Sequence, residues 1–244
     1  MAEIVKLGCL QFNEEPVPLG VKCNGESISF GDAFPGEAIP FVKWGNILVA
    51  SRCVCTNIPW NTLYLRGFIF GYPVKIDGIS YLCRSLKVGA KDGDPNEWDA
   101  VLDAIGDADS IWHWKKEYFW GQDVSEYGTP YQTVRGHHSA RAWSKRHSLS
   151  KDSIVGFRPV LEPLQPEPPV SNSLVGRNLK VYGPTAAISG RLVDFNDYDL
   201  ILQLPADAAS RVLGAQVLSS NGWLADGRRM TLDRSTITWM EKID

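Results

Sequence analysis

The sequence has no long hydrophobic run, and this absence narrows the class of protein. No apolar stretch approaches the ~20 residues that a bilayer-spanning helix needs. The first residues, "MAEIVKLGCLQFNEEP", lack the long apolar core of a secretory signal. The chain also has no internal repeat and no low-complexity segment. We therefore expect a globular cytoplasmic protein that makes no contact with a membrane.

Cysteine is scarce as well. The five cysteines, Cys9, Cys23, Cys53, Cys55 and Cys83, are odd in number and lie in the first third of the chain. An odd number without a secretion signal is typical of reduced thiols. Cys53 and Cys55 would share one face of a strand, but no second cysteine pair or nearby histidine completes a tetrahedral metal site. We expect buried free thiols, no metal site and no cofactor.

The overall composition is that of an ordinary globular protein. The chain has 244 residues, of which 44% are hydrophobic and 22% are charged, and its formal net charge is −3. This length fits one large domain or two small ones. The stretch "EPLQPEPPVSNS", residues 162–173, is rich in proline and predicts an extended, semi-rigid spacer. We expect a first domain over 1–163, a linker over 164–172 and a second domain over 173–244.

The first part of the chain combines strand patterns with one clear helix pattern. Residues 46–55 and 66–86 are typical of strands, and a turn at Asp77-Gly78 divides the second stretch. Apolar residues at helical spacing predict a helix over 94–106, with Asp94 as its cap. This combination predicts the α+β class.

Residues 173–244 are expected to be almost entirely β. Short strands are predicted in "GRNLKVY", "ISGRLVDF", "DYDLILQL" and "STITWMEKI". Turn signals stand at Asn196-Asp197, Asn221-Gly222 and Asp226-Gly227. Several short strands in a segment of this size are typical of a small barrel. The stretch "PADAASRVLG", residues 205–214, predicts one additional helical turn.

Acidic residues are absent from one stretch that is rich in histidine and cations. "RGHHSARAWSKRH", residues 135–147, holds three histidines, four arginines or lysines and one tryptophan. Guanidinium and ammonium groups bind phosphate or carboxylate, and an indole ring offers a stacking face. A tryptophan-rich run precedes this stretch. The candidate binding residues are Trp112, Trp114, Arg135, His137, His138, Arg141, Trp143, Lys145, Arg146 and His147.

Catalysis and metal binding are alternative functions for this stretch. Ser139 and Ser144 lie near the histidines, but a Ser–His pair needs an orienting acid and an oxyanion hole, and no Gly-x-Ser-x-Gly motif is present. Three imidazoles could bind a metal, although the surrounding cations disfavour a divalent ion. A solvated basic loop without a function is a further alternative. We expect a recognition loop, with no catalytic residue and no metal site.

Short motifs in a fixed order run through residues 133–163. An Arg135-Gly136 step, a loop of small and aromatic residues and a closing Gly156-Phe157-Arg158 strand follow one another. This order resembles the end of the C-type-lectin-like domain of formylglycine-generating enzymes. It is more similar still to a group of uncharacterised proteins of phages and Gram-positive bacteria that end in "GFRPVLEP". Formylglycine-generating enzymes bind copper through two cysteines in the loop between these two motifs. The corresponding loop of this chain has no cysteine. The resemblance therefore implies a lectin-like scaffold used for binding.

Two motifs in the last part of the chain resemble those of Sm-like barrels. "GRLVDFNDYDLILQL", residues 190–204, has the Gly-x-Leu strand, turn and Leu-x-Leu strand of the first Sm motif, and "LDRSTITWMEKI", residues 232–243, is similar to the second. Sm-like proteins form rings and bind RNA at these turns. The first turn carries Asp199 where an asparagine would hold a base, and the second has Arg234-Ser235 instead of Arg-Gly. The resemblance thus implies oligomer formation more than RNA binding.

The sequence as a whole predicts a two-domain binding protein without catalytic activity, of phage or mobile-element type, in the cytoplasm of a bacterial host cell. Its partner is expected to be anionic: a nucleotide signal or other small ligand, a nucleic acid, or an acidic protein surface. Such a protein could sequester a host defence component. The C-terminal barrel is expected to form a homo-oligomer, which would let weak sites act together. The alternatives are an enzyme with a histidine general base and an RNA-binding Sm-like protein.

Overall fold

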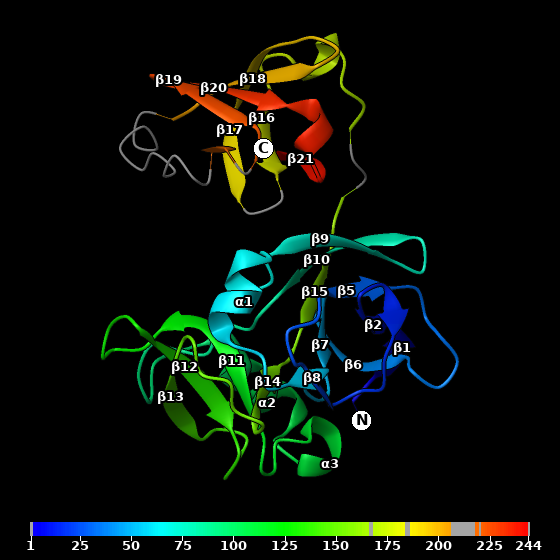
Figure 1. Ribbon diagram of the computed structural model, residues 1–244, viewed down its shortest axis with the longest axis vertical. Helices are drawn as coiled ribbons and strands as arrows, with labels where there is room; N and C mark the ends of the chain where they lie inside the picture. The colour runs from blue at the N-terminus through cyan, green and yellow to red at the C-terminus, as the bar shows by residue number, and fades with distance from the viewer. Residues whose placement is uncertain (1, 166–167, 184–185, 206–217, 220, 244) are drawn as a thin grey trace. The chain divides into compact units, whose positions relative to one another are not determined.

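The computed structural model describes residues 2–165, 168–183, 186–205, 218–219 and 221–243 (Figure 1). The chain forms two compact units, Met1–Pro163 and Leu164–Asp244, each with its own hydrophobic interior. None of the helices in the described part of the chain has the length and apolar character that a bilayer-spanning helix needs.

The fold is mainly β, with 44% strand and 12% helix, so the predicted α+β class is wrong. The helices α1 (Trp60–Leu65), α2 (Glu97–Ile105) and α3 (Asp109–Trp112) are short. The predicted class gave too much weight to the helix over 94–106, and the short strands that precede residue 46 were not predicted. The sheets are curled, as Figure 1 shows.

Unit 1, Met1–Pro163, contains an antiparallel sheet of six strands. Its order is β1 (Ile4–Leu7), β6 (Ile39–Trp44), β7 (Ile47–Ala50), β15 (Val160–Pro163), β10 (Ile79–Arg84) and β9 (Tyr72–Ile76). The predicted turn at Asp77-Gly78 is confirmed, since it joins β9 to β10. A smaller sheet consists of β3 (Glu15–Pro16), β2 (Cys9–Phe12) and β5 (Ile28–Gly31).

A second six-stranded sheet of unit 1 carries the basic stretch. Its order is β13 (Trp143–His147), β12 (Tyr131–Gly136), β11 (Tyr118–Val124), β14 (Val155–Phe157), β8 (Cys55–Thr56) and β4 (Val21–Lys22). Residues 155–163, which were expected to form one strand, instead form two strands, β14 and β15, which belong to different sheets. Residues 143–147 form the edge strand β13, so the expectation of a loop is wrong for this part.

Local sequence explains how α2 begins and ends. The side chain of Asn96 accepts a hydrogen bond from Asp99 N (2.9 Å), so Asn96 is the cap and the expected Asp94 is not. Gly106 follows the last turn with a positive φ of 96°, a conformation that glycine adopts without strain. The apolar face predicted for this helix is buried through Trp98, Val101 and Leu102. This face packs α2 into the interior of unit 1.

The five cysteines are free and buried, as predicted. Cys53 and Cys55 belong to different hydrophobic clusters of unit 1, so they do not share the face that their spacing indicated. Burial raises the pKa of Cys53 and of Cys83 well above the ordinary value, which keeps both thiols protonated. In the described residues, no group of three or more histidine, cysteine or acidic side chains is arranged to hold a metal ion.

Unit 2, Leu164–Asp244, contains one antiparallel sheet of six strands. Its order is β19 (Trp223–Asp226), β20 (Arg229–Asp233), β18 (Asp199–Gln203), β17 (Ala187–Phe195), β16 (Asn178–Tyr182) and β21 (Trp239–Ile243). One-turn helices η1 (Asn172–Leu174) and η3 (Arg234–Thr236) flank the strands. The predicted alternation is confirmed, because Leu200, Leu202 and Leu204 are buried and Ile201 and Gln203 are half-buried. Most of 205–214, predicted as a helical turn, lies outside the described residues.

Candidate functional site

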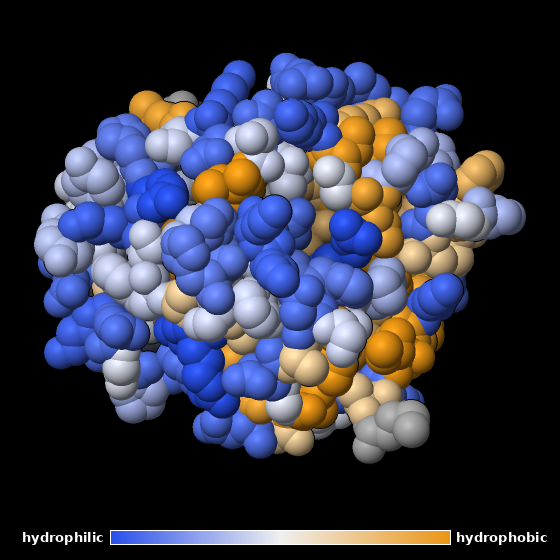
Figure 2. Space-filling view, turned by 90° about the horizontal axis from the view of Figure 1, so that it is seen from below, coloured by the Kyte–Doolittle hydropathy of each residue, from blue (hydrophilic) through white to orange (hydrophobic). Residues whose placement is uncertain are grey.

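The strands β12 and β13 place the basic stretch at one edge of the second sheet of unit 1. Their antiparallel register sets Trp143 opposite Arg135, Lys145 opposite Thr133 and His147 opposite Tyr131. Since side chains alternate across a sheet, these six share one face, and Ser144 and Arg146 lie on the other. In Figure 2, the side of unit 1 that carries these strands is mainly hydrophilic.

Two of the ten candidate residues belong to the interior. Trp112 is fully buried against Trp98, and its indole N–H donates to Gly106 O (2.7 Å). Arg135 is also buried; its guanidinium donates to Val88 O (3.0 Å) and pairs with the carboxylate of Asp99 (2.5 Å). Neither side chain faces solvent, so both stabilise unit 1 instead of contacting a dissolved partner.

Two further tryptophans are held by backbone carbonyls. The indole of Trp114 donates to Asp107 O (2.8 Å), and that of Trp143 donates to Gly89 O (3.2 Å). Both rings are half-buried. Because the N–H group of each indole is already bonded, these rings offer an apolar edge but no hydrogen bond to a ligand.

Arg141 is exposed, but its charge is compensated. Its guanidinium lies 2.7 Å from a carboxylate oxygen of Asp103 and 3.5 Å from one of Asp99, and both acids belong to α2. Sequence reasoning counted Arg141 among the free cations of the stretch. The structure instead pairs it with carboxylates that lie about forty residues earlier, which is a contact that local sequence cannot show.

Lys145 has aromatic neighbours and no carboxylate partner among the residues that the structure describes. Its ammonium lies over the ring of Tyr127 and 5.6 Å from the ring centre of Tyr131. Tyr127 and Tyr131 are 60% and 40% exposed. The ring of His147 meets that of Tyr131 edge-on at 5.9 Å. Neither tyrosine was predicted from the sequence, although only three residues separate "YGTPY", residues 127–131, from the basic stretch.

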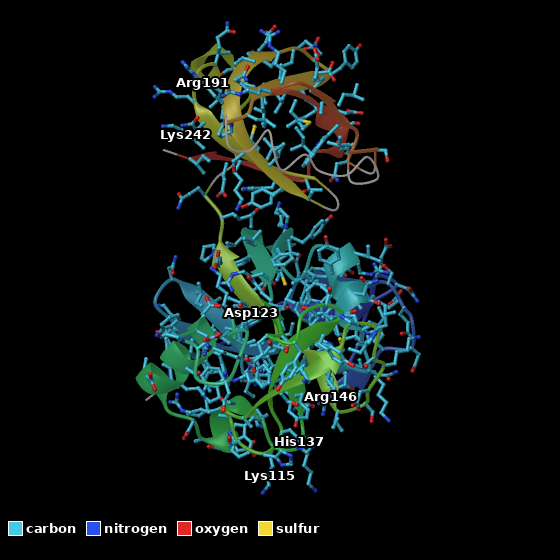
Figure 3. The ribbon with its side chains drawn as sticks, turned by 90° about the vertical axis from the view of Figure 1, so that its left-hand side faces the viewer. Lys115, Asp123, His137, Arg146, Arg191 and Lys242 are labelled. Carbon is cyan, nitrogen blue, oxygen red and sulfur yellow. The ribbon has the colours of Figure 1, made fainter. Side chains whose placement is uncertain are left out.

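Arg146 and the two neighbouring histidines, His137 and His138, lie near Tyr118 on the other face. The guanidinium carbon of Arg146 lies 4.7 Å from the ring centre of Tyr118, and the imidazole of His137 stacks on the same ring at 4.7 Å. Asp152 contributes one distant carboxylate, 3.9 Å from Arg146 Nε. The exposed ring of His138 meets His137 edge-on at 4.3 Å. Figure 3 shows His137 and Arg146 at the same end of unit 1.

His137 is held in a strained backbone position with a poor environment for a proton. Its φ is 73°, and its Nδ1 is buried without a hydrogen-bond partner. Burial lowers the pKa of His137 below the ordinary value, the neighbouring His138 and Arg146 lower it further, and Asp152 opposes them. His137 therefore remains neutral at pH 7 and adds no positive charge to the surface.

Two hydrogen bonds fix which backbone groups of β13 face outward. Gly136 N donates to Ala142 O (3.0 Å), and Ser148 N donates to Pro130 O (2.8 Å). In an antiparallel pair, hydrogen-bonded residues alternate with residues whose N–H and C=O point away from the partner strand. The residues of β13 with outward backbone groups are Trp143, Lys145 and His147.

Two of the three outward carbonyls are occupied, and the outward N–H groups are not bonded to β12. Lys145 O accepts from the guanidinium of Arg146 (2.8 Å), and His147 O accepts from Ser150 N (2.8 Å). The edge therefore presents hydrogen-bond donors next to cationic side chains, a combination that favours an anion. We call the set Tyr127, Tyr131, His137, His138, Lys145, Arg146 and His147 the β13 edge surface.

Catalysis by these histidines has no geometric support. Among the described residues, no histidine of the stretch is hydrogen-bonded to a serine or to a carboxylate, and Nδ1 of His147 accepts from Leu149 N (3.2 Å). A general base needs both a proton to accept and an orienting partner. Among the described residues, these histidines therefore lack the hydrogen bonds that orient a general base.

In unit 2, the turn of residues 196–199 lies beside the one-turn helix η3. Arg234 donates from its guanidinium to Asn196 O and from its backbone N–H to Tyr198 O, each at 2.7 Å. Asn196 closes its own turn by accepting from Asp199 N (2.8 Å). Arg234 thus holds this turn and η3 together.

No known family model, curated protein or solved structure matches this chain. The resemblances to a lectin-like domain and to an Sm-like barrel therefore stay predictions.

Proposed function

We propose that the protein is a non-catalytic binding protein that recognises an anionic partner through the β13 edge surface. The observation that carries the proposal is the outer edge of β13, where N–H groups point outward and Lys145 and Arg146 flank them. A charge-assisted hydrogen bond to an anion is roughly twice as strong as one between neutral groups. An anion at this edge would meet donors from the backbone and from both faces of the strand.

A lysine at a sheet edge also has a simpler explanation. Unpaired edges attract other strands, and charged side chains at the edge prevent that association. The internal bonding of Lys145 O and His147 O has the same effect, because it removes the acceptors that an added strand would need. Edge protection and anion binding are compatible, but only anion binding predicts affinity for a polyanion.

The test compares two sets of cations that are close in sequence and different in structure. Protein variants K145Q/R146Q and R141Q are titrated with inorganic polyphosphate, a single-stranded oligonucleotide and polyglutamate at low salt. We expect K145Q/R146Q to lower the affinity for at least one probe by about tenfold or more, because two charge-assisted contacts are lost. R141Q, whose charge is compensated by Asp99 and Asp103, is the matched control and should change affinity by less than about threefold.

Two results would overturn the proposal. If wild-type protein binds none of the three polyanions at low salt, the cations of the edge serve only to prevent association with other strands. An R141Q variant that loses as much affinity as K145Q/R146Q would show that total charge matters and the edge does not.

We also propose that unit 2 joins copies of the chain, so that several β13 edge surfaces act on one partner. β19 is an edge strand of its sheet, and Leu224 on it is 72% exposed. Removal of residues 173–244 should reduce the mass measured by light scattering to that of a monomer. A truncated chain that keeps the full-length assembly would refute this role. A multivalent anion-binding protein of phage or mobile-element type is suited to sequestering a host signal or defence component.

A further inference from the structure

One face of the β13 edge surface combines exposed aromatic rings with a cation. Tyr131 on β12 and Lys145 and His147 on β13 point to the same side, and Tyr127 reaches this side from the turn before β12. Both tyrosine rings are exposed to solvent. Stacking platforms for planar ligands are built from such rings when they stand in solvent.

Lys145 forms no ion pair with a carboxylate of the described residues. Its ammonium lies over the ring of Tyr127 and near that of Tyr131. A cation over a tyrosine ring is held weakly at an exposed site, so it can leave the ring for a stronger partner. A phosphate or carboxylate is such a partner, because the new hydrogen bond is charge-assisted.

His147 adds a hydrogen-bond donor to this face. Nδ1 of His147 accepts from Leu149 N, which leaves Nε2 as the ring nitrogen that can donate to a ligand. Thr133, opposite Lys145 in the register, is fully buried, and its hydroxyl has no hydrogen-bond partner. Because Thr133 is shielded from solvent, its hydroxyl is not part of the surface that a dissolved ligand would contact.

We infer that Tyr127, Tyr131, Lys145 and His147 form a subsite for a planar aromatic ring that carries a negatively charged group, the chemistry of a nucleotide. The base would stack on a tyrosine ring. The phosphate would pair with the Lys145 ammonium and accept hydrogen bonds from the outward backbone N–H groups of β13. This inference rests on the proposed anion binding and narrows it. An acidic protein surface offers the charge without the planar ring.

The experiment separates the ring from the charge. Binding of adenosine monophosphate, adenosine, ribose 5-phosphate and a tetra-adenylate is measured by calorimetry on the full chain at low salt. Adenosine monophosphate should bind at least about tenfold more tightly than ribose 5-phosphate, since stacking adds to the phosphate contact. A tetra-adenylate that binds more tightly than the mononucleotide identifies single-stranded nucleic acid as the source of the ligand, and equal affinity identifies a free nucleotide.

Variants assign the effect to particular side chains. Y131L and Y127L should each lower the affinity for the mononucleotide by about tenfold and leave the affinity for ribose 5-phosphate unchanged. K145M should lower the affinity for both ligands. Y64L removes a similarly exposed tyrosine of α1 and is the matched control, with unchanged binding. Far-ultraviolet circular dichroism establishes that each variant is folded.

Failure of the inference and failure of the proposed function give different results. If ribose 5-phosphate binds as tightly as the mononucleotide, or if Y127L and Y131L bind like wild type, the aromatic subsite is refuted and anion binding stands. If none of these ligands and no polyanion binds, both proposals are refuted.

Discussion

Arg158 in the interior of unit 1 and Lys145 at the β13 edge are both cations that lack a carboxylate partner among the described residues, but their surroundings differ. Arg158 is fully buried, donates to Ala50 O (3.0 Å) and Trp112 O (2.7 Å), and lies beside aromatic rings of the core. Lys145 touches two tyrosine rings that stand in solvent. The same type of charge supports the fold in one place and remains open to a partner in the other.

Sequence neighbours within a basic stretch need not act together. Arg135 is fixed by Asp99 in the interior and Arg141 by two acids of α2, whereas Lys145 and Arg146 carry charge at the edge. Stability and binding should therefore respond to different members of the stretch.

The largest effect is expected at Arg158. Replacement R158M leaves two buried carbonyls without a donor and lowers the free energy of unfolding by about 3–5 kcal/mol. Urea denaturation followed by tryptophan fluorescence measures this loss. A loss below about 1 kcal/mol would contradict the structural role of the buried guanidinium.

The second largest loss of stability is expected at Arg135. R135M removes the partner of Asp99, but Asn96 Nδ2 still donates to this carboxylate (2.6 Å), and Arg141 remains 3.5 Å away. Because the remaining contacts compensate in part, we expect a loss of about 2–3 kcal/mol, which is smaller than at Arg158. The same denaturation experiment checks the order, and a reversed order would show that Asp99 depends on Arg135 alone.

Edge and surface cations should matter little for stability. R141Q breaks two exposed ion pairs and should lower the free energy of unfolding by about 0.2–1 kcal/mol. K145Q should change it by less than about 0.5 kcal/mol. A K145Q variant that unfolds as easily as R135M would remove the distinction between edge and interior.

The pH dependence of stability gives the smallest effect. The pKa of His137 is lowered in the folded protein, so the unfolded chain binds the proton more readily. Stability is therefore lost as the pH falls through the ordinary histidine pKa of about 6.5 toward the lower folded value. H137N, which tolerates the left-handed backbone, should flatten the difference between unfolding free energies at pH 7 and pH 5. An unchanged difference would show that His137 does not carry this dependence.

The second unit was more predictable from sequence than the first. In unit 2, the alternation of Leu200, Leu202 and Leu204 and the turns at Asn196-Asp197 and Asp226-Gly227 are local signals, and they correspond to β17–β18 and β19–β20. In unit 1, the strands before residue 46 have two to six residues, and several are buried on both faces, as in β2. Without alternation, periodicity gives no signal.

The candidate site was predictable only in part. The position of the basic stretch was evident from the sequence. The burial of β12 was not, because this strand contains the polar residues Gln132, Thr133 and Arg135. Polar residues of this kind indicate a loop, and burial becomes possible only because Asp99 on α2 pairs with Arg135. Contacts over long sequence separation decide which cations are free, and a single sequence does not contain that information.

The most direct test of anion binding at the β13 edge is the salt dependence of affinity for inorganic polyphosphate. Affinities of wild type, K145Q/R146Q and R141Q are measured over a range of sodium chloride concentrations. Each cation that contacts a phosphate contributes about one unit to the slope of log affinity against log salt concentration. We predict that the slope falls by about 2 in K145Q/R146Q and is unchanged in R141Q. Equal slopes in wild type and K145Q/R146Q would contradict the account.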